Sequence, residues 1–216
     1  MKFKKLFAGV AAAATLLAGM AFGTGAANAA ETTVDTAATV TFKASKEKQL
    51  TSAQLSAYKI ADYVNYGTAK TPVYGVKTAA GANRTKLAAA LTAAGFQNVP
   101  IDGTTDLMAW AMNQKTTTDT DGTVTQVQFD QSETRPWNNP SVTRKFADAL
   151  QAGNPFTATA DPFVLNKATG NDTDGWTATN KTALTAGVYL FLDGNASTDT
   201  LTQAVPMIVS TGSVDA

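Results

Sequence analysis

Threonine is the residue that most constrains the fold of this chain. It occupies 35 of the 216 positions, and 33 of these lie beyond residue 29. A β-branched side chain with a hydroxyl group suits a pleated surface that is half exposed to water, so this abundance favours strands. Glycine and proline together contribute only 23 residues, too few for a low-complexity or collagen-like chain. The sequence therefore predicts a folded, mostly β protein with inserted helices, an α+β architecture.

The chain contains neither cysteine nor histidine. This composition excludes thiol nucleophiles, disulfide bonds, metal sites built from Cys or His, and every Ser-His-Asp relay. No cofactor or metal site is expected. Stability must therefore come from packing and hydrogen bonding, or from a covalent link of another kind.

Residues 1–29 have the three parts of a secretory signal peptide. Lys2, Lys4 and Lys5 form a basic start, an uncharged apolar run follows to about residue 22, and Ala27-Asn28-Ala29 is a small-residue cleavage site. A membrane anchor is the alternative, but the run is rich in Ala and Gly and no stop-transfer charges follow it. We expect cleavage before Ala30 and a single module over residues 30–216, because no linker divides them.

The zero net charge of the whole chain hides a mildly acidic mature protein. Removing the three lysines of the signal peptide leaves 14 basic against 17 acidic residues, a net charge of −3. No basic stripe is present, so nucleic acid is not expected as a partner. No second apolar stretch reaches membrane-spanning length, so no membrane insertion is expected after signal cleavage.

Alternating and apolar segments predict strands at both ends of the mature chain. In the segment 54–64, strict alternation would place Lys59 and Asp62 on opposite faces. The predicted strands cover residues 39–44, 54–64, 123–129, 176–178, 187–193 and 204–210. Residues 116–122, TTTDTDG, are predicted to form a polar turn.

Three helices are expected in the middle of the chain. The clearest covers 83–94, where Leu87 and Leu91 recur at helical spacing between an Asn83 cap and a Gly95 stop. A second is expected at about 104–114, capped by Thr104 or Thr105. A third, at about 141–151, follows Pro140 and ends near Gly153.

Four segments carry a resemblance to a known family. They are VTFKAS at 40–45, LSAYKIADY at 55–63, LTAGVYLFLD at 184–193 and AVPMIVSTG at 204–212. Each is an ordinary amphipathic strand, but their order and spacing resemble the N-terminal domain of sortase-assembled pilin (fimbrial) subunits. The similarity is to those of Gram-positive bacteria, especially actinobacteria such as bifidobacteria.

This resemblance implies an immunoglobulin-like β-sandwich of pilin N-domain type, acting as a structural and adhesive subunit of a fimbrium at the cell wall. Its partners would be other pilin subunits, a sortase that links them, and a host glycan or matrix protein as adhesion ligand. The protein would be secreted and cell-surface bound, and would not be an enzyme. An LPxTG-type sorting signal and a YPK-type pilin motif do not occur in the sequence, so we expect these residues to be the N-terminal part of a longer subunit.

The family's stabilising chemistry is an intramolecular amide between a Lys and an Asn, promoted by a buried acid. The resemblance makes Lys43 and Lys59 the candidate lysines, Asp62 and Asp193 the candidate acids, and Asn195 the nearest asparagine. Alternation places Lys43 opposite Phe42, so exposure to solvent is the simpler expectation for that lysine. The terminal-strand asparagine of the family has no counterpart, and the triad is incomplete.

Other sites and function classes remain open. Trp137 and Trp176 lie beside turn residues and could form a sugar or peptide platform, or seal the edge of the core. This leaves a secreted carbohydrate- or matrix-binding module without polymerisation as an alternative.

Two further classes are less favoured. A glycan-active enzyme would need a carboxylate pair such as Asp130 with Glu133, or Asp172 with Asp174. The loops 119–122 and 171–175 resemble the start of a calcium loop but lack the closing Glu.

Overall fold

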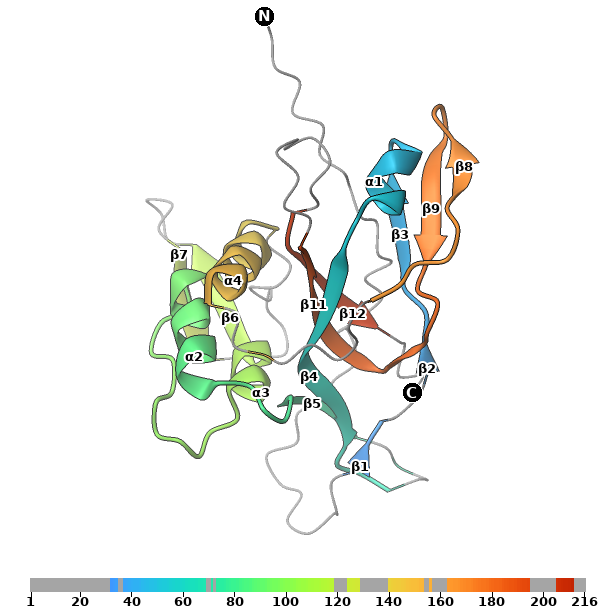
Figure 1. Cartoon of the computed structure of the whole chain (residues 1–216). Coiled ribbons are helices and arrows are strands. Elements are labelled where there is room, and N and C mark those ends of the chain that lie inside the picture. Colours follow the sequence, from blue (N-terminus) through green and yellow to red (C-terminus); the bar gives the residue numbers. More distant parts are fainter. Residues whose placement is uncertain are drawn as a thin grey trace, which may run out of the picture.

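A computed structural model describes residues 32–34, 37–68, 71, 73–118, 124–128, 140–153, 156, 163–194 and 205–211. The predicted signal peptide lies outside the described residues. Within them, a central antiparallel sheet lies between a smaller sheet on one side and helices on the other (Figure 1). The expected mostly β fold with inserted helices is confirmed, in an open, sandwich-like α+β arrangement.

The central sheet is built around β4 (Leu55–Asn65) and β11 (Gly187–Asp193), which pair along seven residues of β11. Beyond β11 lies β12 (Met207–Thr211). The far end of β4 pairs with β5 (Tyr74–Thr78) and with the short β1 (Thr32–Thr33). All of these pairings are antiparallel.

The smaller sheet consists of β3 (Thr41–Ala44), β9 (Gly175–Thr179) and β8 (Thr169–Asn171), in that order. The pair β2 (Ala37–Ala38) and β10 (Leu184–Thr185) involves the residues just before β3 and those just before β11. Between β3 and β4 the chain forms the short helix α1 (Glu47–Thr51).

Three helices cover the other face of the central sheet. They are α2 (Arg84–Ala93), α3 (Leu107–Met112) and α4 (Pro140–Gly153), and α2 packs against α4. The strands β6 (Gln114–Thr118) and β7 (Val124–Gln128) pair beside them. The helix predicted at 83–94 is confirmed, including the Asn83 cap, whose side chain accepts from the N–H of Lys86 at 3.1 Å.

Two apolar cores lie on the two faces of β4 and β11. On the helix side, Ile60, Val188 and Leu190 pack with residues of α2, α3 and α4. On the other side, Phe42 and Phe163 pack edge-on against Phe191 with ring centroids 5.1 and 5.0 Å apart. Because side chains alternate along a strand, one pair of strands supplies both cores.

Two predictions about elements need correction, and one strand was missed. The second helix begins at Leu107 and is capped by Asp106, because Thr104 and Thr105 both donate to Asp102 instead. Residues 116–118, predicted as part of a turn, belong to β6 and pair with β7. The strand β5 was not predicted.

Candidate functional site

The most enclosed charged pair among the predicted site residues joins Lys59 to Asp62 on β4. The Lys59 ammonium lies 2.5 Å from an Asp62 carboxylate oxygen, and these side chains are only 13% and 23% exposed. The same ammonium donates to the hydroxyl of Thr185 at 2.8 Å and lies 5.8 Å from the centre of the Tyr189 ring. Two of the predicted residues are therefore brought together, on one side of the central sheet.

A β-bulge explains why Lys59 and Asp62 share a face. In the pairing of β4 with β11, Lys59 opposes Tyr189 and Ala61 opposes Val188, which leaves Ile60 without an opposite residue. The extra residue shifts the alternation, so that Ile60 and Ala61 both reach the helix-side core. The prediction that Lys59 and Asp62 lie on opposite faces is therefore wrong.

Gly187 gives the Lys59 side chain its space. A Cβ atom at residue 187 would lie 2.6 Å from Lys59 Cε and 2.5 Å from the carbonyl oxygen of Ala61. The hydroxyl of Thr211 accepts from the N–H of Gly187 at 3.1 Å, which attaches β12 to the same point. The first residue of β11 thus has to be small because a lysine stem and a backbone carbonyl cross over it.

The contacts of Lys59 suit an ion pair rather than amide formation. An amine attacks a carbonyl only as the neutral base beside an electrophile, whereas the Lys59 ammonium is held by a carboxylate and a hydroxyl. The Tyr189 hydroxyl donates to the carbonyl oxygen of Thr185 at 2.7 Å and completes the enclosure. These contacts fit an ion-pair clamp between β4 and the start of β11.

The other isopeptide candidates lie elsewhere. Lys43 is exposed on β3, on the face opposite Phe42, as alternation predicts. Asp193 is buried at the end of β11, and its carboxylate accepts from the N–H of Gln54 at 2.9 Å. Asn195 lies outside the described residues.

Of the two candidate platform tryptophans, Trp137 lies outside the described residues. Trp176 is half-buried and packs against the core around Phe42. Its indole N–H donates to Asp172 at 2.9 Å. This placement matches the interpretation that Trp176 seals the edge of the core.

Sequence reasoning missed the buried Asn180. Its side-chain oxygen accepts from the N–H of Val40 at 2.7 Å, and its amide donates to the carbonyl oxygens of Ala38 and Thr182 at 3.3 and 2.8 Å. These bonds hold β2 and β3 against the chain after β9. No motif or periodic pattern in the sequence marked this residue.

The two carboxylates of the loop 171–175, Asp172 and Asp174, have different partners. Asp172 pairs with Lys46 at 2.6 Å, and hydrogen bonds from Lys46 and Trp176 hold the pKa of Asp172 below its ordinary value. Asp174 accepts from the side chain of Asn171 at 2.9 Å. Across the described part of the chain, no three acidic residues gather into a metal-binding group. The pair Asp130 and Glu133 and the loop 119–122 lie outside it.

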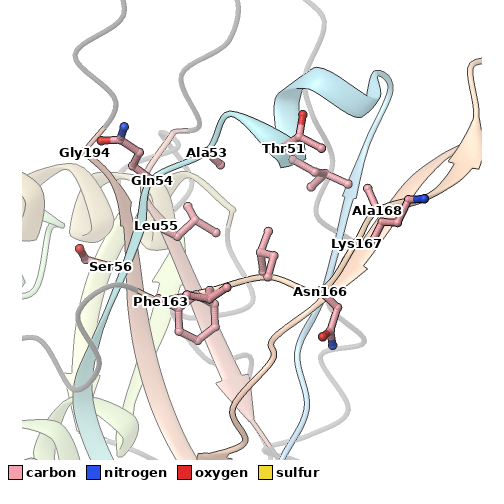
Figure 2. A pocket seen from close by; sticks show the side chains of 13 residues that line it. Thr51, Ala53, Gln54, Leu55, Ser56, Phe163, Asn166, Lys167, Ala168 and Gly194 are labelled. Carbon is pink, nitrogen blue, oxygen red and sulfur yellow. The ribbon is translucent and has the colours of Figure 1, made fainter.

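A hollow of about 540 Å³ opens between α1, the start of β4 and the segment 163–168 (Figure 2). Leu55 and Phe163 lie on one side of it, Asn166 and Lys167 lie across from them, and Thr51 lies on the α1 side. Lys167 is the one charged residue of its lining. Val164, 48% exposed, also lines it.

A second hollow, of about 370 Å³, lies between α2 and the loop that follows it. Its rim carries Ile101, which at 90% exposure is the most exposed large apolar side chain of the described residues. The loop is braced from within, because Arg84 donates to the carbonyl oxygens of Thr105 and Pro100 at 2.6 and 3.4 Å. Hydrogen bonds from Thr105 and Thr104 hold the pKa of Asp102 well below its ordinary value.

Comparison with known proteins identified no relative. No family model matches the chain, and neither a curated protein nor a solved structure matches it significantly. Among the described helices, none combines the length and the apolar character needed to cross a membrane.

Proposed function

We propose that this chain is a structural and adhesive module of a cell-surface fimbrium, of the pilin N-domain type with an immunoglobulin-like sandwich. The proposal rests on the resemblance in four strand segments and on the signal peptide at 1–29. Its partners are other subunits of the same fimbrium, the sortase that links them, and a glycan or matrix protein on a host surface.

One observation carries the proposal. The four segments of the resemblance are separated in sequence but adjoin in space, because β4 pairs with β11 and β11 with β12. The first segment joins them through Phe42 of β3, whose ring packs against Phe191 of β11. Their contact supports the proposal because the resemblance requires these four segments to form one structural unit.

The resemblance nominates two lysines for the amide link. Lys59 is enclosed, whereas Lys43 is exposed. The ammonium of Lys59 is already held by Asp62 and Thr185, and neither residue is an asparagine. We therefore propose that the Lys59–Asp62 ion pair takes the place of the amide link at this position.

Sortase dependence tests the proposed function. Cell-wall material from the source bacterium is boiled in SDS and probed with antibodies against residues 30–216, in parallel with a strain that lacks the sortase. We expect a ladder of high-mass species that disappears in the mutant, because amide-linked subunits resist SDS. A single monomer-sized species in the culture medium of both strains would favour the secreted binding module without polymerisation.

A further inference from the structure

The smaller sheet turns one face to the core and the other to solvent. Val40, Phe42 and Ala178 belong to the core between the two sheets. Because side chains alternate along a strand, the residues between them face outward. The outward residues are Thr39, Thr41 and Lys43 along β3, Thr177 and Thr179 on β9, and Thr169 on β8. Neither a carboxylate nor a large apolar side chain is among them.

The strand register arranges these outward side chains in two rows. Thr41 lies opposite Thr179, and Lys43 lies opposite Thr177, which has Thr169 on its other side. Neighbouring strands are about 5 Å apart, and side chains on one face of a strand recur about every 7 Å. Figure 1 shows this sheet at one side of the molecule, away from α2, α3 and α4. The rows therefore form a regularly spaced polar array at the surface, which we call the threonine face.

Three exposed lysines accompany the threonine face. Lys43 lies within it. Lys167 and Lys181 follow the same alternation, because their neighbours Ala168 and Asn180 are buried. None of the three lysines takes part in an ion pair within the described part of the chain. The sequence contains no run of basic residues, but the fold brings these three cations to one face.

Both flanking lysines lie close to β9. The N–H of Lys181 donates to the carbonyl oxygen of Val164 at 2.9 Å, directly after β9 ends. The residue before Lys167 is Asn166, whose N–H donates to the carbonyl oxygen of Thr179 at 2.7 Å. Lys167 and Lys43 therefore lie on opposite sides of β9, and the cations surround the threonines of that strand.

The carboxylates of the β8–β9 turn do not neutralise these cations, because they have other partners. Asp172 accepts from Lys46 at 2.6 Å and from the indole N–H of Trp176 at 2.9 Å. Asp174 accepts from the side chain of Asn171 at 2.9 Å. The threonine face thus keeps a local positive charge although the mature chain is mildly acidic.

The hydroxyls of the threonine face keep capacity for further hydrogen bonds. Those of Thr39 and Thr41 bond to no described residue. The Thr179 hydroxyl accepts from the side chain of Asn166 at 2.8 Å, which leaves its own hydrogen to donate. Because a threonine side chain is stiff at χ1, little conformational freedom is lost when its hydroxyl binds a ligand.

We propose that the threonine face binds a linear polysaccharide that carries carboxylates, with sugar hydroxyls on the threonines and carboxylates on Lys43, Lys167 and Lys181. Sugar hydroxyls donate and accept hydrogen bonds as threonine hydroxyls do, and a carboxylate complements an ammonium group. An acidic peptide offers the carboxylates but lacks the row of hydroxyls. The proposal rests on the proposed adhesive function and names the class of glycan that this function would recognise.

Binding to immobilised hyaluronan, which has a carboxylate on every second sugar, tests the proposal by biolayer interferometry of residues 30–216. The same polymer with its carboxylates reduced to alcohols forms the neutral control surface. One variant combines Lys43→Gln with Lys181→Gln. The matched control combines Lys86→Gln with Lys145→Gln, which removes two exposed lysines from α2 and α4.

We expect hyaluronan to bind and the carboxyl-reduced polymer not to bind. The Lys43 and Lys181 double variant should weaken binding about tenfold, because each exposed ion pair contributes up to about fivefold. The control double variant should change it less than about twofold, since distant exposed charges are screened by salt. Thr41→Val keeps the shape of the side chain but removes its hydroxyl, and should weaken binding about threefold.

Three results would overturn the proposal. They are an absence of hyaluronan binding, equal losses in the two double variants, and equal binding of hyaluronan and the carboxyl-reduced polymer. A surface of polyglutamate, which has carboxylates without sugar hydroxyls, completes the test. Binding to polyglutamate as tight as to hyaluronan would also overturn it, because the face would then recognise polyanions in general.

These outcomes are distinguishable from failure of the proposed function. A sortase-dependent ladder without hyaluronan binding would reject the glycan site and leave the fimbrial function standing. Binding that depends on Lys43 and Lys181, without any ladder, would support the glycan site in a secreted binding module and reject the fimbrial function.

Discussion

Gly187 and Lys59 share a small volume where β4 crosses the start of β11. Replacing Gly187 by Ala would put a methyl group 2.5 Å from the carbonyl oxygen of Ala61, a backbone atom that cannot swing away. Overpacking of this kind costs about 1–3 kcal/mol. We therefore expect Gly187→Ala to lower the free energy of unfolding, measured by urea denaturation, by about that amount.

Gly153 is the matched control for Gly187→Ala. It closes α4, and a Cβ atom there would meet nothing within 4 Å. Gly153→Ala should leave stability unchanged or raise it by a few tenths of a kcal/mol, roughly the gain from a less flexible unfolded chain. Equal effects of the two substitutions would contradict the crossing described at Gly187.

The Lys59–Asp62 pair should be worth more than an ion pair on the surface. Lys59→Met keeps most of the apolar stem but removes the cation from a carboxylate that is 23% exposed. Because Asp62 then stays partly desolvated without a partner, we expect a loss of about 2 kcal/mol in the free energy of unfolding.

Lys46→Met provides the comparison for Lys59→Met. The Lys46–Asp172 pair has a similar distance, 2.6 Å, but its side chains are 60% and 61% exposed. Such a pair contributes about 0–1 kcal/mol. If Lys46→Met were as destabilising as Lys59→Met, enclosure would not be the reason for the strength of the Lys59 pair.

At the scale of elements, Asp106 connects α3 to β5 through hydrogen bonds. Its carboxylate caps α3 by accepting from Ala109 N–H at 2.9 Å, and it also accepts from the N–H and the hydroxyl of Thr78 at about 3 Å. Asp106→Ala leaves these donors without an acceptor, so we expect a loss of about 2–4 kcal/mol in unfolding free energy.

Asn83→Ala is the control that removes a helix cap without removing hydrogen bonds to another element. Asn83 caps α2 through one local bond to Lys86 N–H, so its removal should cost about 1 kcal/mol. Denaturant unfolding of both variants checks the comparison. A loss for Asp106→Ala no larger than that for Asn83→Ala would mean that the bonds to Thr78 contribute nothing.

Elements with local signals were predictable from the sequence. The helix α2 begins after Asn83 and ends before Gly95, as its cap and stop residues indicate. The residues of β11 are almost all apolar, and the strand was predicted with its exact bounds. In both cases the deciding interactions lie within the segment or in its own hydrophobicity.

Elements decided by distant partners were not predictable. Nothing within LSAYKIADY marks Ile60 as a bulged residue, because the bulge exists only in the register with β11. Since the bulge brings Lys59 and Asp62 to one face, the geometry of the candidate site also depended on that register. Thr104 and Thr105 resembled helix caps, but both donate hydrogen bonds to the carboxylate of Asp102 instead.

At the scale of the whole molecule, β4 and β11 join two cores through one pair of strands. Ile60 and Leu190 face the helices, whereas Ala57 and Phe191 face the smaller sheet. A contact that fixes the register of β4 against β11, such as the Lys59 clamp, therefore aligns both cores at once.

The central proposal, that this chain is a module of a fimbrium, is tested most directly by immunogold electron microscopy of the source organism. Antibodies raised against residues 30–216 are applied to intact cells and to cells lacking the gene. We expect gold particles along thin filaments that project from the wall, and neither filaments nor particles in the mutant. Gold confined to the wall or the medium, with unlabelled filaments that persist in the mutant, would contradict the claim.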